Sequence, residues 1–520
     1  MRLRVVACLL ALTLPARATG FADHARELGA EPDETVRLDG YYRVRAEALY
    51  NLDLDRGPTP SGELLYPVPV GSRNGQTLTR ADMRFRTDLS VYAPGGMVAV
   101  KARLDALDNV ALGSAPEGIP AASGSQRSES STLRIKRVWG ETLTPVGALA
   151  IGRMGSHWGL GILTNAGDCL DCDSGDAADR IAFVTPLLGH FWAIAYDFSA
   201  TGPFVPDRTG TRSIDFAPSA SVHTLTFAVL RSRTDAARRR RARAGKDTLE
   251  YGAYASHRWQ NDDVPATYLP VSQPVTVDER QVMARGYTAT AGDVWSRLSG
   301  RGYRVEAELA YLRARVEQPS LVPGVLFHDA ATSSQLGMAL ESEFGDADDS
   351  YRLGLDAGYA SGDSAPGFGA FPGENARAPQ PGDLDGPQAR PPYDNTVQNF
   401  RFHPDYRIDR ILFREIIGTV TDAVYLRPHL AGDVFRFTSG RLRASLFSVF
   451  SFAVNPESTP GEKQALGVEL DPGLQYESRD GFVFGLEQAT LFPLAGLDNP
   501  ALGLRAKSAQ LWRLSAAFTF

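Results

Sequence analysis

The segment 36–50, VRLDGYYRVRAEALY, alternates between two classes of side chain over its whole length. One parity is mostly apolar and carries Tyr42 and Tyr50, whereas the other carries charged residues such as Arg43 and Arg45. A period of two is that of a β-strand, whose successive side chains point to opposite faces. An average soluble strand has about five or six residues. A longer alternation, with one charged face and tyrosines toward both ends, is typical of a strand that crosses an outer membrane.

Segments of the same kind recur as far as the last residue, where LWRLSAAFTF places Trp512, Leu514 and Phe518 on the same face as Phe520. About 18 such strands can be counted, and their connections alternate between tight turns and long polar loops. Outer-membrane barrels have this alternation, with short periplasmic turns and long extracellular loops. The sequence therefore predicts an all-β fold, a single transmembrane antiparallel β-barrel of about 18 strands over residues 35–520. Both ends of the barrel chain are expected in the periplasm.

The first residues predict export from the cytoplasm. MRLR is basic, VVACLLALTLP is apolar, and the small residues Ala16 and Ala18 follow, which is the order of a secretory signal peptide. We expect residues 1–18 to be removed and residues 19–34 to form a periplasmic N-terminal segment. No later apolar run approaches the roughly 20 residues of a membrane-spanning helix. The formal net charge of −7 gives no reason to expect nucleic acid as a partner.

Two connections depart from the general pattern. Residues 361–410 begin as a Pro/Gly-rich stretch and end in a segment that contains Phe400, Phe402 and Tyr406. Exposed, these aromatic side chains would form an unusual patch, so we expect that part to pack inward and narrow the pore, whereas the Pro/Gly-rich part is equally a surface loop. Residues 231–247 contain RRRR on the periplasmic side. This run is either a solvated basic face or a docking point for an acidic partner or anionic lipid headgroups.

The loop sequence GDCLDCDSGD contains Cys169 and Cys172. Outside the cytoplasm a local disulfide is the default for two cysteines so close together. The alternative is a Ca²⁺ site built from Asp168, Asp171 and Asp173, because hard carboxylate oxygens are the ligands of calcium. The spacing does not match an EF-hand loop, and we expect neither a metal nor a cofactor.

Strand parity also predicts which charged side chains face the lumen. Guanidinium groups bind carboxylate and phosphate in a fixed bidentate geometry, so an arginine-rich wall can attract anions. Acidic residues of the same parity, such as Asp88 and Asp105, leave open a salt-bridge network that only stiffens the wall. The predicted lumen-facing, solute-binding residues are Arg37, Arg43, Arg45, Arg84, Arg86, Lys101, Arg103, Arg441 and Arg443, with Arg513 of the last strand on the same side.

The alternation that ends on Phe520 resembles the C-terminal signal by which bacterial outer-membrane proteins are recognised for barrel assembly. The first strand, LDGYYRVRAEALYNLDL, is similar to that of alginate-export porins, which are barrels that pass an anionic polysaccharide. GRMGSHWGLGILTNAGDCLDCDSGDAADRI and FHPDYRIDRILFREIIGTVTDAVYLRP resemble an uncharacterised family of myxobacterial outer-membrane barrels. The resemblance implies a location in the outer membrane of a Gram-negative bacterium. The selectivity residues of the exporters cannot be matched one by one, so none is carried over.

Together these features predict a porin-like channel for a polar, anionic solute, with exopolysaccharide export ahead of small-solute uptake. The alternative is a structural or adhesive barrel with a plugged lumen. A hydrolase within the barrel ranks below both, because Ser156 and His157 are adjacent, so their side chains point to opposite faces in an extended segment, and no hydrolase motif is present. We therefore expect no enzyme activity. The expected partners are outer-membrane lipid and lipopolysaccharide, the barrel-assembly machinery and a periplasmic export partner.

Overall fold

The computed structural model describes most of the chain. The predicted signal peptide (1–18) and the segment 19–34 lie outside the described residues, and so does part of the Pro/Gly-rich stretch, residues 369–378. The described ranges are 35–71, 75–113, 133–264, 279–322, 324–345, 351–368 and 379–520.

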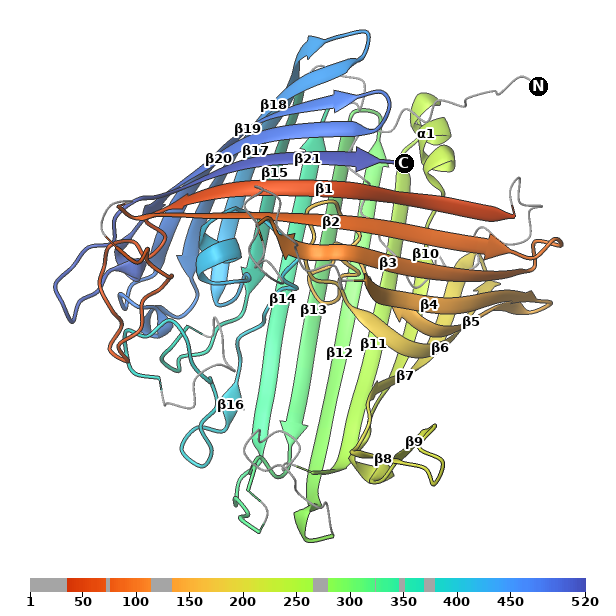
Figure 1. Cartoon of the computed structure of the whole chain (residues 1–520), viewed down its shortest axis with the longest axis horizontal. Coiled ribbons are helices and arrows are strands. Elements are labelled where there is room, and N and C mark those ends of the chain that lie inside the picture. Colours follow the sequence, from red (N-terminus) through yellow and green to blue (C-terminus); the bar gives the residue numbers. More distant parts are fainter. Residues whose placement is uncertain are drawn as a thin grey trace, which may run out of the picture.

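Within these ranges, 18 antiparallel strands form one closed wall (Figure 1). The last strand pairs with the first, from Tyr41 opposite Thr519 to Tyr50 opposite Gln510. The predicted single antiparallel barrel of about 18 strands is thus confirmed. The wall strands are β1 (Val36–Tyr50), β2 (Thr77–Tyr92), β3 (Val98–Ala111), β4 (Leu133–Thr144), β5 (Gly147–Gly155), β6 (Ala177–Leu187), β7 (His190–Ala200), β10 (Val222–Arg231), β11 (Thr248–Asp263), β12 (Met283–Gly300), β13 (Tyr303–Val316), β14 (Ala331–Phe344), β15 (Tyr351–Ala360), β17 (Ala423–Arg436), β18 (Gly440–Ala453), β19 (Ala465–Ser478), β20 (Phe482–Pro493) and β21 (Ala509–Thr519).

The remaining elements belong to the connections. Strands β8 and β9 form a small separate hairpin, and β16 pairs in parallel with β14. The connection from β10 to β11 contains the α-helix α1. These elements are β8 (Phe204–Pro206), β9 (Ser213–Asp215), β16 (Thr396–Val397), α1 (Asp235–Arg243), 3₁₀ turns at Pro218–Ala220, Glu279–Gln281, Pro456–Ser458 and Ala495–Leu497, and a π-helical turn at Leu412–Ile416.

The two ends of the barrel differ in the length of their connections. At one end the strands are joined by short turns such as 145–146, 188–189 and 301–302, and at the other by long loops such as 156–176 and 361–422. Short turns mark the periplasmic end of an outer-membrane barrel. The start of β1 and the end of β21 both lie at this end.

The outer face of the wall is apolar and exposed. Ile151, Ile181 and Val294 point outward and are each about half exposed, and comparable side chains surround the barrel. Such a continuous surface is too large and apolar for a water-soluble protein, whereas lipid covers it without cost. The chain is therefore a bacterial outer-membrane β-barrel, as predicted. Aromatic side chains form girdles at both edges: Tyr42, Trp192, Tyr251, Tyr476 and Phe518 toward the short turns, and Tyr50, Tyr196, Trp259, Phe492 and Trp512 toward the long loops.

No helix among the described residues has both the length and the apolar character to cross a bilayer.

The C-terminal residue takes part in closing the barrel. Phe520 and Gly40 exchange two main-chain hydrogen bonds of 3.1 Å, and the Phe520 ring stacks on Phe85 at 5.8 Å. A Cβ atom at Gly40 would lie 2.3 Å from the Arg86 carbonyl oxygen and 2.8 Å from the Phe520 ring. Glycine at this position lets the terminal aromatic ring lie against the strand.

We predict that Gly40→Ala destabilises the closed barrel by about 1–3 kcal/mol, the usual range for forcing an extra carbon into a packed site. The measurement is the midpoint temperature at which the folded band of unboiled protein disappears from a denaturing gel. Gly292→Ala is the matched control, because a Cβ at this outward-facing strand glycine meets nothing within 4 Å. Equal midpoints for the two variants would contradict the role given to Gly40.

Candidate functional site

A long loop crosses the barrel lumen. The disulfide loop, residues 156–176, joins β5 to β6. At its start Trp158 donates to Asp293 of β12 at 3.0 Å, and the Gly161 N–H donates to Glu308 of β13 at 3.0 Å. Its tip contacts β1 to β4 and β21, which lie halfway round the closed wall from β12 and β13. The disulfide loop therefore connects opposite sides of the lumen.

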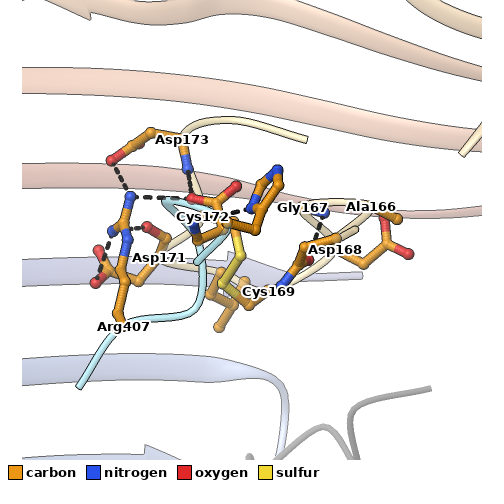
Figure 2. Close-up of a disulfide and its surroundings, with 12 residues drawn as sticks. Ala166, Gly167, Asp168, Cys169, Asp171, Cys172, Asp173 and Arg407 are labelled. Atoms are coloured by element: carbon orange, nitrogen blue, oxygen red, sulfur yellow. Dashed lines mark hydrogen bonds and ion pairs between the residues drawn. A yellow bond between two sulfur atoms is a disulfide. The ribbon is translucent and has the colours of Figure 1, made fainter. Parts of the chain in front are cut away.

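A disulfide bond closes the tip of this loop. The sulfur atoms of Cys169 and Cys172 are bonded, and the Cys172 N–H donates to the Cys169 carbonyl oxygen at 3.3 Å. Figure 2 shows Asp171 and Asp173 on the side of the disulfide that faces Arg407, and Asp168 on the other side. The loop tip that the disulfide closes thus presents carboxylates in two directions.

Asp171 is the most heavily contacted of the three carboxylates. Guanidinium groups from two wall strands and from a second loop converge on its two oxygen atoms. Four arginines lie within 4 Å: Arg45 at 3.0 Å, Arg407 at 3.3 Å, Arg414 at 2.5 Å and Arg513 at 3.1 Å. Burial alone would raise the pKa of Asp171, but Arg414, Arg513 and Arg407 more than offset it, so that the pKa lies well below its ordinary value.

Asp173 and Asp168 are bound in the same way. Asp173 accepts from Arg45 and Arg407, both at 2.8 Å, and from Arg43 at 3.1 Å. On the far side of the disulfide, Asp168 pairs with Arg103 and Arg137. Its pKa also lies below the ordinary value, because Arg103 and Arg137 outweigh the opposing effect of burial.

The wall arginines also bind the main chain of the disulfide loop. Arg43 donates to the Leu170 carbonyl oxygen at 2.5 Å, and Arg84 donates to that of Cys172 at 2.6 Å. Arg86 donates to the Gly167 carbonyl oxygen at 2.9 Å. The wall therefore recognises both the carboxylates and the backbone of the tip.

The nine predicted lumen-facing cations fall into two groups. Five of them contact the disulfide loop: Arg43, Arg45, Arg84, Arg86 and Arg103. The others pair with acids of the wall: Arg37 with Asp39 at 2.6 Å, Lys101 with Glu141 at 3.3 Å, Arg441 with Glu477 at 2.5 Å and Arg443 with Asp433 at 3.1 Å. A role for either group in solute binding stays a prediction.

Three of the arginines that bind the disulfide loop were not predicted from the sequence. Arg137 faces inward because the register between β3 and β4 shifts next to Arg103, which breaks simple parity counting. Arg407 and Arg414 come from a connection in which no strand pattern fixes side-chain direction. Their proximity to several aromatic residues was the one available signal.

This second connection is the aromatic loop, residues 361–422, between β15 and β17. Phe400, Phe402 and Phe413 are almost fully buried, within a cluster that includes residues of the wall. Glu469 of β19 accepts the N–H groups of Ile411 and Leu412 at 2.8 and 3.0 Å. The aromatic segment thus packs inside the barrel.

The two loops also contact each other. The His403 N–H donates to the Ile162 carbonyl oxygen at 2.8 Å, and Arg407 reaches from the aromatic loop to Asp173. Together they span the lumen from β12 and β13 to β1, and on to β19.

The geometry gives the calcium alternative no support. The oxygen atoms of Asp168, Asp171 and Asp173 are bound by guanidinium groups. Among the residues that the structure describes, no group of three His, Cys, Asp or Glu side chains is arranged to hold a metal ion.

No family model matches the sequence, and no curated protein matches it. The fold is similar to solved outer-membrane proteins that share little sequence with it. OpdK of Pseudomonas aeruginosa, in a crystal structure with vanillate, is 11% identical with a TM-score of 0.45, over 93% of this chain and 98% of that chain. OccK11 (OpdR) of the same organism is 10% identical with a TM-score of 0.46, over 93% and 96%. A BenF-like porin of Pseudomonas fluorescens Pf-5 is 7% identical with a TM-score of 0.43, over 94% and 99%.

These likenesses assign neither a solute nor an activity to the chain. The finer resemblances to alginate-export porins and to myxobacterial barrels stay predictions, and so does the absence of enzyme activity.

We predict that Asp171→Asn loosens the disulfide loop, because it removes a carboxylate shared by four guanidinium groups, and a hydrogen bond to a charged group contributes about 1.5–3 kcal/mol. Hydrogen exchange of the amides at 166–176 should accelerate at least about tenfold, which corresponds to about 1.4 kcal/mol. Asp179→Asn is the control, since the Asp179–Arg153 pair is half exposed and such pairs contribute little. Unchanged exchange in Asp171→Asn would refute the anchoring role.

Proposed function

We propose that the barrel is an outer-membrane conduit for a polar, anionic solute, and that the disulfide loop holds it closed in this state. The observation that carries this proposal is the cluster of Arg45, Arg407, Arg414 and Arg513 around Asp171. Arg45 and Arg513 belong to wall strands, and the other two arginines belong to the aromatic loop, which packs inside the barrel. The carboxylate that all four share belongs to the disulfide loop.

The pairing pattern distinguishes this cluster from a network that only stiffens the wall. Some arginines elsewhere in the wall pair with an acid on the neighbouring strand, as in Arg180 with Asp197 at 2.6 Å and Arg285 with Asp263 at 2.6 Å. Around Asp171 four guanidinium groups share a carboxylate that comes from a loop and not from the wall. Two of these groups also contact acids of the wall, Arg45 with Asp82 and Arg513 with Glu47. Displacement of the loop would leave an anion-binding surface, since arginine binds carboxylate and phosphate bidentately.

The serial arrangement of the cluster favours a polymeric solute. Asp168, Asp171 and Asp173 are bound at successive points along the inner wall, and an acidic polysaccharide also presents its carboxylates in series. Export of such a polymer therefore ranks ahead of uptake of a small anion. Movement of the polymer through the barrel would have to be driven from the periplasm by a partner protein.

A structural or adhesive barrel with a plugged lumen is the second candidate. It is favoured by the contacts between the two loops, which join opposite walls through the Ile162–His403 hydrogen bond and the Arg407–Asp173 ion pair. In that case the arginine cluster would serve only to fix the plug.

Single-channel recording in a planar bilayer separates the two candidates. We expect the Asp171→Asn/Asp173→Asn double variant to open more often than the wild type and to prefer anions, because the closing contacts weaken while the arginines remain. Arg407→Gln/Arg414→Gln should also open but should lose part of the anion preference, because two of the cationic groups are removed.

The folded band on unboiled gels shows that each variant retains the barrel before it is recorded. Cation-selective openings of the aspartate variant would refute the anionic solute. If folded protein with both aspartates replaced never opens, the barrel is plugged and the conduit proposal fails.

A further inference from the structure

Helix α1 occupies the short-turn end of the barrel, where the neighbouring strands are joined by two-residue turns. The helix has a regular start, since Thr234 accepts the Ala237 N–H as its N-cap and Asp235 pairs with Arg238. Arginines in its last turn lie at the negative end of the helix dipole, where cations are favoured. The basic run 231–247 therefore consists of helix α1 and the residues on either side of it.

Two arginines fix α1 to the inner side of the wall. Arg238 pairs with Glu250 of β11 at 3.2 Å, and Arg241 donates to the hydroxyl of Thr248 at 3.2 Å. Glu250 and Thr248 are inward-facing and almost fully buried, and Glu250 is also bound by Arg297 at 2.7 Å. The anchored face of α1 therefore lies against the periplasmic mouth of the lumen and not against the lipid belt.

The other arginines of the helix point away from these anchors. Residues at a spacing of three share a helix face, so Arg238 and Arg241 face the wall together. Arg239, Arg240 and Arg243 are exposed, and none of them forms a salt bridge within the described part of the chain. Lys246 adds another exposed cation directly after the helix.

This distribution differs from that of an ordinary solvated helix. A surface helix usually mixes the signs of its charges, and like charges four residues apart, as in Arg239 and Arg243, destabilise it. The helix dipole accounts for cations in the last turn, but it does not account for a face without acids in a protein whose net charge is −7. An external anion would compensate this face.

We infer that α1 is a capture site for a carboxylate-bearing polysaccharide chain at the periplasmic mouth of the barrel. The inference rests on the proposed function for the identity of its ligand and adds the side from which the solute is loaded. A saccharide chain is favoured over an acidic protein because the anchored helix lies at the lumen opening, where a polymer that enters the barrel from the periplasm would first meet it. Clustered cations raise the local concentration of an anion and its association rate.

The test is the binding of fluorescent oligogalacturonate to the full-length barrel in detergent at low ionic strength. Arg239→Gln/Arg240→Gln should weaken binding about tenfold, because two exposed cationic contacts are lost. Arg208→Gln/Arg212→Gln is the matched control, since it removes two exposed arginines from the β8–β9 connection at the other end. Equal affinity of the two double variants, or no binding by the wild type, would overturn the inference.

Two further arms separate this inference from the proposed function. A hexaglutamate peptide that binds through α1 while oligogalacturonate does not would assign the surface to an acidic protein and overturn the saccharide. In bilayer recordings, oligogalacturonate added on the α1 side should block the wild type more often than it blocks Arg239→Gln/Arg240→Gln. Added on the other side, it should block the two proteins equally often. If oligogalacturonate binds in detergent through α1 but the barrel never conducts, the result would support the capture site and refute the conduit.

Discussion

The interior of this barrel is governed by the need to neutralise arginines that are removed from water. Arg84 and Arg513 are almost fully buried, and an unpaired charge in such a place would be prohibitively costly. The wall supplies part of the compensation, for example Asp108 for Arg84 at 2.8 Å. The disulfide loop supplies the rest, through carboxylates and carbonyl oxygens. Its position across the lumen follows from this requirement.

The same requirement links blocking of the lumen by the disulfide loop to recognition of a solute. A loop held by charge-assisted hydrogen bonds is firmly bound, yet any anion of similar geometry can compete for the same guanidinium groups. The disulfide contributes by limiting the shapes available to the tip between Cys169 and Cys172. Arg407 and Arg414 couple the aromatic loop to this contact, so the two loops would respond together.

The sequence carried enough information for the wall but not for its contents. Period-two alternation assigns Arg43 and Arg45 to the lumen, because one face of every strand must meet lipid. It fails at Arg137, where the irregular pairing of β3 with β4 shifts the parity. The surroundings of Asp171 could not be predicted, because its partners lie more than a hundred residues away on β1 and β21 or in the aromatic loop. Such contacts depend on how a loop folds back, and local periodicity carries no record of that.

Hydrogen exchange of the disulfide loop in wild-type protein, with increasing concentrations of oligogalacturonate, tests the central claim most directly. If the arginine cluster is an anion site that the loop occupies, exchange at 166–176 will rise with the oligomer and saturate. A neutral oligosaccharide of equal length, at the same ionic strength, will have no effect. Exchange that stays constant at every concentration of the acidic oligomer would contradict the account and leave the cluster as a fixed part of a plug.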